Sequence, residues 1–172
     1  RLVDDLRILA LADAGELQIE KQSVDVKDFL QGMQERFRSA GEERQVQIVV
    51  QDRPACPSIQ VDPDRLAQIF TNLIGNALRY TPAGGKILLS AECDRDEVRM
   101  IVSDNGSGIP VDALPNIFER LYRVDKARSR SEGGSGLGLA IARQLAVTQG
   151  GNLTAENNPE GGARFVFTIP NH

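Results

Sequence analysis

The chain has 172 residues, a formal net charge of -4 and a hydrophobic fraction of 41%. These values fit one soluble globular domain with a single core, and the acidic balance argues against nucleic acid as a partner. No stretch approaches the ~18 consecutive apolar residues that a membrane-spanning helix needs. Cys56 and Cys93 have the spacing of neither a metal site nor a redox motif.

Residues 1–14 have the apolar spacing of an amphipathic or coiled-coil helix, which begins without a capping residue. Residues 15–24 are predicted to form a linker, with a short strand at 17–20. The periodicity fits an ordinary lead-in helix as well as part of a longer helical hairpin, so spacing alone leaves the role of this helix open.

The next segments predict a mixture of helix and strand. Asp25 is expected to cap a helix whose apolar face is formed by Val26, Phe29, Leu30, Met33, Phe37 and Ala40. Strands are predicted at 46–51, 58–61, 86–93, 98–104, 152–156 and 163–169. The last four form two hairpins, and the helices are collected separately. This order favours an α+β fold, a two-layer sandwich with a mixed, mostly antiparallel sheet and helices on one face.

A third helix is expected to begin at Asp62, with Pro63 in its first turn. It carries Asn72 and Asn76, which lie four residues apart and share a face, and Arg79 near the same stripe. Asn is a poor helix-interior residue, and amide oxygens can ligate Mg²⁺ without adding negative charge beside a triphosphate. Two solvated or capping asparagines are the alternative, which this segment alone does not exclude.

A glycine-rich turn, Asp104-Asn105-Gly106-Ser107-Gly108-Ile109-Pro110, follows a predicted buried strand. The glycines let the backbone approach a flat ligand closely. A buried carboxylate needs hydrogen-bond donors, and the exocyclic amine of adenine is one. Asp-Asn-Gly is also a common turn, so the segment does not identify a function by itself.

A short helix with an aromatic anchor is predicted at 116–123, before a polar and basic segment at 124–130. The two segments together carry Arg120, Arg123, Lys126, Arg128 and Arg130. A lid that closes on a polyphosphate and a solvated basic loop both fit this composition.

A second glycine-rich loop at 133–139 leads into an apolar helix at 140–147. Such a loop presents free N–H groups and the positive end of the helix dipole, for which phosphate is the natural ligand. The segment lacks the Gly-Lys-Ser/Thr of a Walker loop and the βαβ unit of a Rossmann fingerprint.

Taken in order, these segments resemble the ATP-binding catalytic domain of sensor histidine kinases, within the gyrase/Hsp90/histidine kinase/MutL superfamily and its Bergerat-type fold. Residues 72–81 resemble the asparagine box, 104–110 the first glycine box, 117–123 the phenylalanine box and 134–139 the second glycine box. The likeness covers roughly residues 25 to 170.

The resemblance implies a role for each matching residue. Asn72, Asn76 and Arg79 would be catalytic, Asn76 would hold Mg²⁺, Asp104 would read adenine, and a lid would run from about 111 to 132. The implied ATP contacts are Asn72, Asn76, Arg79, Tyr80, Asp104, Gly106, Gly108, Ile109, Tyr122, Arg123, Lys126, Gly134, Ser135, Gly136, Leu137, Gly138 and Leu139.

The same resemblance predicts the organisation of the protein. Residues 1–14 would end the dimerisation hairpin, 15–24 would be a linker, and 25–172 would form the catalytic domain. The implied partners are the protein's own dimerisation and histidine-phosphotransfer domain and a response regulator receiver domain. The expected setting is a homodimer whose cytoplasmic kinase is anchored in the inner membrane.

Asn72 indicates the type of reaction. Relatives that hydrolyse ATP or phosphorylate Ser carry a Glu base at this position, whereas Asn cannot accept a proton at neutral pH. A neutral imidazole needs no such base, which favours phosphoryl transfer to a histidine. The single histidine, His172, lies outside the motifs, so the acceptor is expected upstream. A superfamily ATPase or serine kinase and a non-catalytic nucleotide-sensing module stay as alternatives; Ala163, where the family often has Ser or Thr, leaves room for the last.

Overall fold

The computed structural model describes residues 2–51, 56–124 and 135–171. In chain order its elements are α1 (Leu2–Asp13), β1 (Gln22–Val24), α2 (Val26–Arg44), β2 (Gln47–Val50), β3 (Ile59–Val61), α3 (Pro63–Tyr80), β4 (Lys86–Cys93), β5 (Glu97–Asp104), the 3₁₀ turn η1 (Leu114–Asn116), α4 (Gly138–Thr148), β6 (Asn152–Asn157) and β7 (Ala163–Pro170). Across these ranges, no helix combines the length and the apolar character needed to cross a bilayer.

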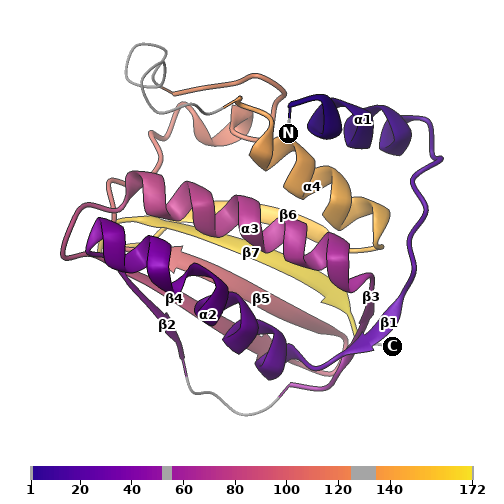
Figure 1. Cartoon of the computed structure of the whole chain (residues 1–172), viewed down its shortest axis with the longest axis horizontal. Helices are drawn as coiled ribbons and strands as arrows, with labels where there is room; N and C mark the ends of the chain where they lie inside the picture. Colours follow the sequence, from indigo (N-terminus) through magenta and orange to yellow (C-terminus); the bar gives the residue numbers. More distant parts are fainter. Residues whose placement is uncertain (1, 52–55, 125–134, 172) are drawn as a thin grey trace.

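Five strands form one mixed sheet in the order β2-β4-β5-β7-β6. β2 runs parallel to β4, and every other neighbouring pair is antiparallel. β1 and β3 pair separately as a two-stranded antiparallel sheet. The helices α2, α3 and α4 lie over one face of the large sheet (Figure 1). The α+β sandwich predicted from the sequence is therefore confirmed.

The core lies between this sheet and the helices. Along β7, the side chains of Ala163, Phe165, Phe167 and Ile169 are buried and alternate with more exposed neighbours, because successive side chains of a strand point to opposite faces. The apolar face of α3 is buried in the same core and lies against β4 and β5. Phe70 of α3 meets Phe29 of α2 edge to face, with ring centroids 5.2 Å apart. Each large side chain buried here contributes roughly 1.5–3 kcal/mol.

The start of α3 is held in place by Asp62. Its Oδ1 accepts hydrogen bonds from the backbone N–H of Asp64 and Arg65, at 3.0 and 3.1 Å. These bonds satisfy two of the donors that a helix N-terminus leaves unpaired. The backbone N–H of Asp62 donates to Gln149 Oε1 at 2.6 Å, so the beginning of α3 is tied to the end of α4. These contacts therefore anchor the N-terminal end of α3, the helix that carries Asn72 and Asn76.

The N-terminal helix α1 packs against α4 (Figure 1). Leu9 is its buried contact, and the rest of the helix is largely exposed. At its last residue, Asp13 accepts from Arg120 Nη2 at 2.6 and 2.7 Å. The helix predicted at 1–14 is confirmed, and it lies against α4.

Two local predictions are wrong. No strand forms at 17–20; the strand that pairs with β3 is Gln22–Val24. The helix predicted at 116–123 is replaced by η1 and a series of turns. Leu121 has a φ of +62° and its N–H donates to Gly136 O at 3.0 Å, so this backbone pairs with another loop instead of with its own preceding turn.

Candidate functional site

Asp104 is the buried acid at the end of β5. It is only 5% exposed. Its Oδ1 accepts hydrogen bonds from the backbone N–H of Gly106 at 2.9 Å and of Ala163 at 3.2 Å. Among the described residues, the hydrogen bonds of this carboxylate all fall on Oδ1. Oδ2 is thereby left as an acceptor for a ligand.

Burial raises the pKa of the Asp104 carboxyl above its ordinary value, and the hydrogen bonds from Gly106 and Ala163 oppose that rise. Desolvation disfavours the charged form, whereas backbone donors favour it. A donor from a ligand would stabilise the charged form further. The site therefore suits a group that brings an N–H to the carboxylate, such as an exocyclic amine.

Ala163 and Gly162 form the wall behind Asp104. A Cβ added to Gly162, whose φ is +90°, would lie 1.9 Å from the carbonyl oxygen of Asp104, so no side chain fits at that position. Ala163 lacks the hydroxyl that the family resemblance leads one to expect at this position. In this structure its backbone N–H contacts Asp104 directly, so that hydrogen bond does not require the hydroxyl.

Tyr80 lies beside the first glycine-rich turn. A Cβ added to Gly106 would lie 2.3 Å from the Tyr80 carbonyl oxygen, and the N–H of Ser107 donates to that oxygen at 3.3 Å. The C-terminal end of α3 is thus fastened to the turn that follows Asp104. The Tyr80 side chain is 42% exposed, which leaves its ring accessible at the edge of this site.

Two asparagines that the sequence analysis did not select hold this turn. Asn157 pairs with the backbone of Ile109 through two hydrogen bonds, each 2.7 Å long. Nδ2 of Asn158 donates to the carbonyl oxygens of Asp104 and Ala163 at 3.0 and 3.3 Å. Asn157 ends β6, and Asn158 begins the turn that leads to β7. Their only signal in the sequence is a turn that begins with consecutive asparagines.

The asparagine face of α3 meets the start of α4. A Cβ added to Gly138 would lie 3.5 Å from Asn72 Oδ1, which places the first turn of α4 beside that amide. Asn76 and Arg79 are half-buried on the same helix. The structure therefore brings the face of α3 that carries Asn72 next to the end of the second glycine loop.

The second glycine loop also contacts the segment that precedes it. Gly136 has a φ of +72°, and a Cβ there would lie 3.1 Å from Leu121 Cα. Ser135 Oγ accepts from the N–H of Leu137, which is buried at the start of α4. Tyr122 packs against the core and Arg123 is half-buried nearby in sequence. Leu139 is also half-buried and packs against the core.

The aromatic anchor predicted near 118 is present, although its helix is not. Phe118 meets Phe165 of β7 edge to face, with ring centroids 6.4 Å apart. The Arg143 guanidinium of α4 lies 5.1 Å from the centroid of the Phe118 ring, within the range of a cation–π contact. Ala113 and Ile117 are buried as well. The first part of the predicted lid is thus fixed to the sheet and to α4.

Some predicted residues lie outside the described residues. Lys126 and Gly134 fall in 125–134, as do most of the basic charges of the predicted lid. Their proposed contacts to phosphate stay predictions.

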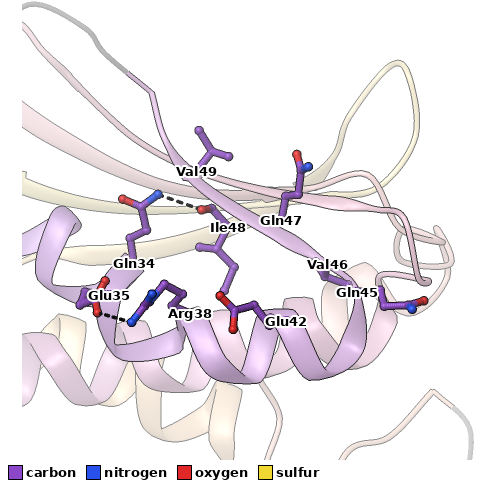
Figure 2. A pocket seen from close by; sticks show the side chains of 10 residues that line it. Gln34, Glu35, Arg38, Glu42, Gln45, Val46, Gln47, Ile48 and Val49 are labelled. Carbon is purple, nitrogen blue, oxygen red and sulfur yellow. Dashed lines mark hydrogen bonds and ion pairs between the residues drawn. The ribbon is translucent and has the colours of Figure 1, made fainter.

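A cavity of about 630 Å³ lies elsewhere, between α2 and β2 (Figure 2). Gln34 points across it and donates to Ile48 O at 2.9 Å, and Glu35 pairs with Arg38 at 3.1 Å. Glu35, Arg38 and Glu42 line it, so its charged side chains carry one more carboxylate than guanidinium, which disfavours an anionic polyphosphate. The cavity includes none of the predicted site residues, so the candidate site is the surface around Asp104, Asn72 and the start of α4.

Comparison with known proteins agrees with this geometry. Residues 61–172 match the family model described as histidine kinase-, DNA gyrase B-, and HSP90-like ATPase. The chain belongs to this ATPase family. Among curated relatives, it is 37% identical over 174 residues to the signal transduction histidine-protein kinase BaeS of Escherichia coli and 35% identical over 174 residues to the sensor histidine kinase WalK of Bacillus subtilis. Both alignments cover 99% of the chain.

Solved structures place it within the same family. A crystal structure of full-length ShkA in complex with AMPPNP superposes with a TM-score of 0.87 at 32% identity, over 98% of this chain and 35% of that one. The catalytic domain of the histidine kinase ThkA superposes with a TM-score of 0.76 at 25% identity, over 88% and 95%. The chain is therefore a catalytic ATP-binding domain of the histidine kinase type. It spans 36% of the length of BaeS and 28% of WalK.

Proposed function

We propose that this domain binds Mg-ATP between Asp104 and the start of α4, and donates the γ-phosphate to a histidine on a dimerisation hairpin of the same protein, for relay to a response regulator aspartate. The buried Asp104 carboxylate, with one oxygen held by the backbone and the other left for a ligand, is the observation that carries the nucleotide site.

At the adenine end, Asp104 Oδ2 accepts from the exocyclic amine. The turn at Gly106 lies directly against Tyr80 O and Asp104, where a side chain would clash, so the turn stays close to the carboxylate. Ile109 is held by Asn157, which fixes the far side of the turn. Because these hydrogen bonds hold the turn before a ligand binds, binding of adenine should require little ordering of this segment.

At the phosphate end, the N-terminus of α4 provides unpaired N–H groups and a positive dipole. Asn72 lies beside it, and Asn76 follows one turn along α3. The described residues contain no cluster of three or more Asp, Glu, His or Cys that could hold a metal. Amide oxygens of this kind fit Mg²⁺ bound chiefly through substrate phosphates, and Asn76, with Asn72 next to it, would hold the ion. Bound Mg²⁺ neutralises charge on the phosphates.

Asn72 also supports transfer to histidine. Asn72, one helical turn before Asn76, lies beside the start of α4. By the family resemblance, this is the position at which hydrolytic relatives carry a Glu base for water or a serine hydroxyl. Asn72 cannot accept a proton at neutral pH. A neutral imidazole attacks through its own lone pair, and catalysis then rests on positioning and charge neutralisation.

Titration calorimetry with AMPPNP tests the site. The parent chain is expected to bind with an affinity that depends on Mg²⁺, and Asp104→Asn to weaken binding by about 1–3 kcal/mol, because an amide presents a donor to the adenine amine. Asp96→Asn is the matched control, since that exposed residue lies at the other end of β5. Equal affinity of parent and Asp104→Asn would overturn the adenine assignment.

A second experiment tests the transfer. The chain joined to its upstream hairpin is incubated with γ-labelled ATP, and the product is assayed for acid-labile, base-stable phosphate, the signature of phosphohistidine. Release of free phosphate in place of labelled protein would favour an ATPase. Nucleotide binding with neither product would favour a nucleotide-sensing module.

A further inference from the structure

Asn105 and Gly106 form the only Asn-Gly pair in the sequence. The backbone nitrogen of the residue that follows an asparagine can attack the carbon of the asparagine side-chain amide and close a succinimide ring. The chain itself joins these atoms, so ring closure needs bond rotation but no approach of a distant partner. Glycine leaves the attacking nitrogen unhindered because it has no Cβ. Asn105 is exposed, so water can reach its amide.

The attacking nitrogen is hydrogen-bonded to a carboxylate. The backbone N–H of Gly106 donates to Asp104 Oδ1 at 2.9 Å. This oxygen is therefore placed to take the proton while the nitrogen forms its new bond, which is the task of a general base. Burial raises the pKa of the Asp104 carboxyl above its ordinary value, and a higher pKa makes the carboxylate a stronger base.

The amide under attack is held by hydrogen bonds as well. The backbone N–H of Lys86 donates to Asn105 Oδ1 at 2.8 Å, and the N–H of Asn105 donates to Lys86 O at 3.2 Å. Negative charge develops on Oδ1 when a nucleophile adds to this amide, and a donor that is already in place stabilises that charge. The turn thus combines a base at Asp104, a nucleophile at Gly106 and a donor at Lys86.

We propose that Asn105 is a self-modification site, which loses ammonia to form a succinimide with Gly106 and is then hydrolysed to aspartate or isoaspartate. Asp104 takes the proton from the Gly106 nitrogen as that nitrogen bonds to Asn105 Cγ. The Cγ–Nδ2 bond then breaks, and the amide nitrogen leaves as ammonia with the proton that Asp104 held. Water cleaves the ring between Cγ and the Gly106 nitrogen to give aspartate, or between that nitrogen and the main-chain carbonyl of 105 to give isoaspartate.

The modification would act on the nucleotide site, a consequence that rests on the proposed function. An aspartate at 105 adds negative charge beside the Asp104 carboxylate that accepts from the adenine amine. An isoaspartate also lengthens the main chain before Gly106, whose backbone lies tightly against Tyr80 O. The modified protein should therefore bind nucleotide more weakly. Bound nucleotide should in turn slow the modification, because a donor to the Asp104 carboxylate stabilises its charged form and makes it a weaker base.

The experiment incubates the folded 172-residue chain at neutral pH, beside a synthetic peptide of residues 101–110 as the unstructured reference. Digestion and mass spectrometry follow the conversion at 105. We expect a species lighter by one ammonia, followed by a species in which an acid replaces the amide, and faster conversion in the folded chain than in the peptide. AMPPNP with Mg²⁺ should slow the conversion in the folded chain.

Asp104→Asn is the decisive variant, because its amide oxygen can still accept from Gly106 but cannot take the proton. Conversion at 105 should slow by roughly 10²-fold, the lower end of what a positioned base contributes. Asn105→Gln is the matched control: it keeps an amide on a longer side chain, and the mass changes at 105 should disappear.

The proposal is overturned if the folded parent converts no faster than the peptide, because the fold would then protect Asn105. Equal rates in the parent and Asp104→Asn would overturn it as well. Conversion is measured by mass and AMPPNP binding by calorimetry, so a failure of this proposal and a failure of the proposed function give separate results.

Discussion

Arg120 Nη2 lies 2.6 and 2.7 Å from the two carboxylate oxygens of Asp13. Asp13 ends α1, and Arg120 belongs to the segment anchored by Phe118, so one ion pair joins the N-terminal helix to the base of the predicted lid. Both side chains are about half-exposed, at 50% for Arg120 and 47% for Asp13. The ion pair therefore orients α1 on the domain and adds little to the free energy of unfolding.

Breaking this pair should loosen α1 without unfolding the domain. We expect Arg120→Ala to change the free energy of unfolding by about 0–1 kcal/mol, as for other exposed ion pairs. Hydrogen exchange in 2–13 should accelerate, because Leu9 would be the main remaining buried contact of α1. The exchanged pair Asp13→Arg with Arg120→Asp should restore slow exchange. Unchanged exchange in Arg120→Ala would show that the pair does not hold the helix.

Asp104 should make the nucleotide-free fold less stable at neutral pH. Because burial raises its pKa, the folded protein holds this proton more tightly than the unfolded chain does. Stability from this group is therefore full below its unfolded pKa, about 3.9, and falls as pH rises through the folded pKa. We expect Asp104→Asn to unfold at higher urea than the parent at neutral pH, with the gap closing in acid. A variant less stable than the parent at neutral pH would contradict this.

The affinity for nucleotide should also depend on the ionisation of Asp104, but it should rise with pH, whereas the contribution of Asp104 to stability falls. Only the charged Asp104 carboxylate accepts freely from the adenine amine, so binding should weaken as pH falls through the raised pKa. Calorimetry of AMPPNP binding at several pH values measures this, with Asp104→Asn as the comparison. A pH profile that is the same in parent and variant would assign the titration to another group.

Gly162→Ala should be far more damaging than Gly161→Ala. Both residues have a positive φ, +90° and +105°, so both substitutions strain the backbone by roughly 1 kcal/mol. Only the Cβ at 162 meets backbone, at 1.9 Å from Asp104 O, whereas nothing lies within 4 Å at 161. We expect a loss of ~3 kcal/mol or more at 162, measured by urea unfolding. Similar losses at both positions would mean that backbone strain, and not the clash with Asp104, causes the loss of stability.

Asn157→Asp should lower nucleotide affinity through the turn that it holds. The amide donates to Ile109 O and accepts from Ile109 N, both at 2.7 Å, and a carboxylate cannot donate. The expected cost is about 1–3 kcal/mol in stability, with weaker AMPPNP binding. Asn152→Asp, at the exposed start of the same strand, is the matched control. Full affinity in Asn157→Asp would show that the turn does not need this pair.

Asn76→Ala should reduce the dependence of nucleotide binding on Mg²⁺. An alanine supplies no oxygen to the metal, so AMPPNP affinity with and without EDTA should become more alike than in the parent. Asn171→Ala, at a half-buried position just after β7, is a control for nonspecific effects. Equal metal dependence in Asn76→Ala and the parent would refute the proposed role.

Much of the fold could be predicted from short-range signals in the sequence. Such signals predicted the helix caps at Asp25 and Asp62, the helix that contains Phe70 and Leu73, and the two hairpins. All of these elements are present in the structure. The segment around Phe118 was misread as a helix because its apolar spacing fits one. Tertiary contacts prevail there: Phe118 packs on Phe165, and the N–H of Leu121 pairs with Gly136.

The order of the nucleotide-binding motifs, the absence of a base at Asn72 and the layered α+β architecture could be predicted before any coordinates were known, since each depends on residue type or on periodicity along the chain. Which atoms meet depends on the folded arrangement. Asn157 on Ile109 and Gly162 against Asp104 join positions 48 and 58 residues apart (157 − 109 = 48; 162 − 104 = 58). Such contacts arise because the sheet brings distant strands into register, and that register is set by the burial of one face as a whole.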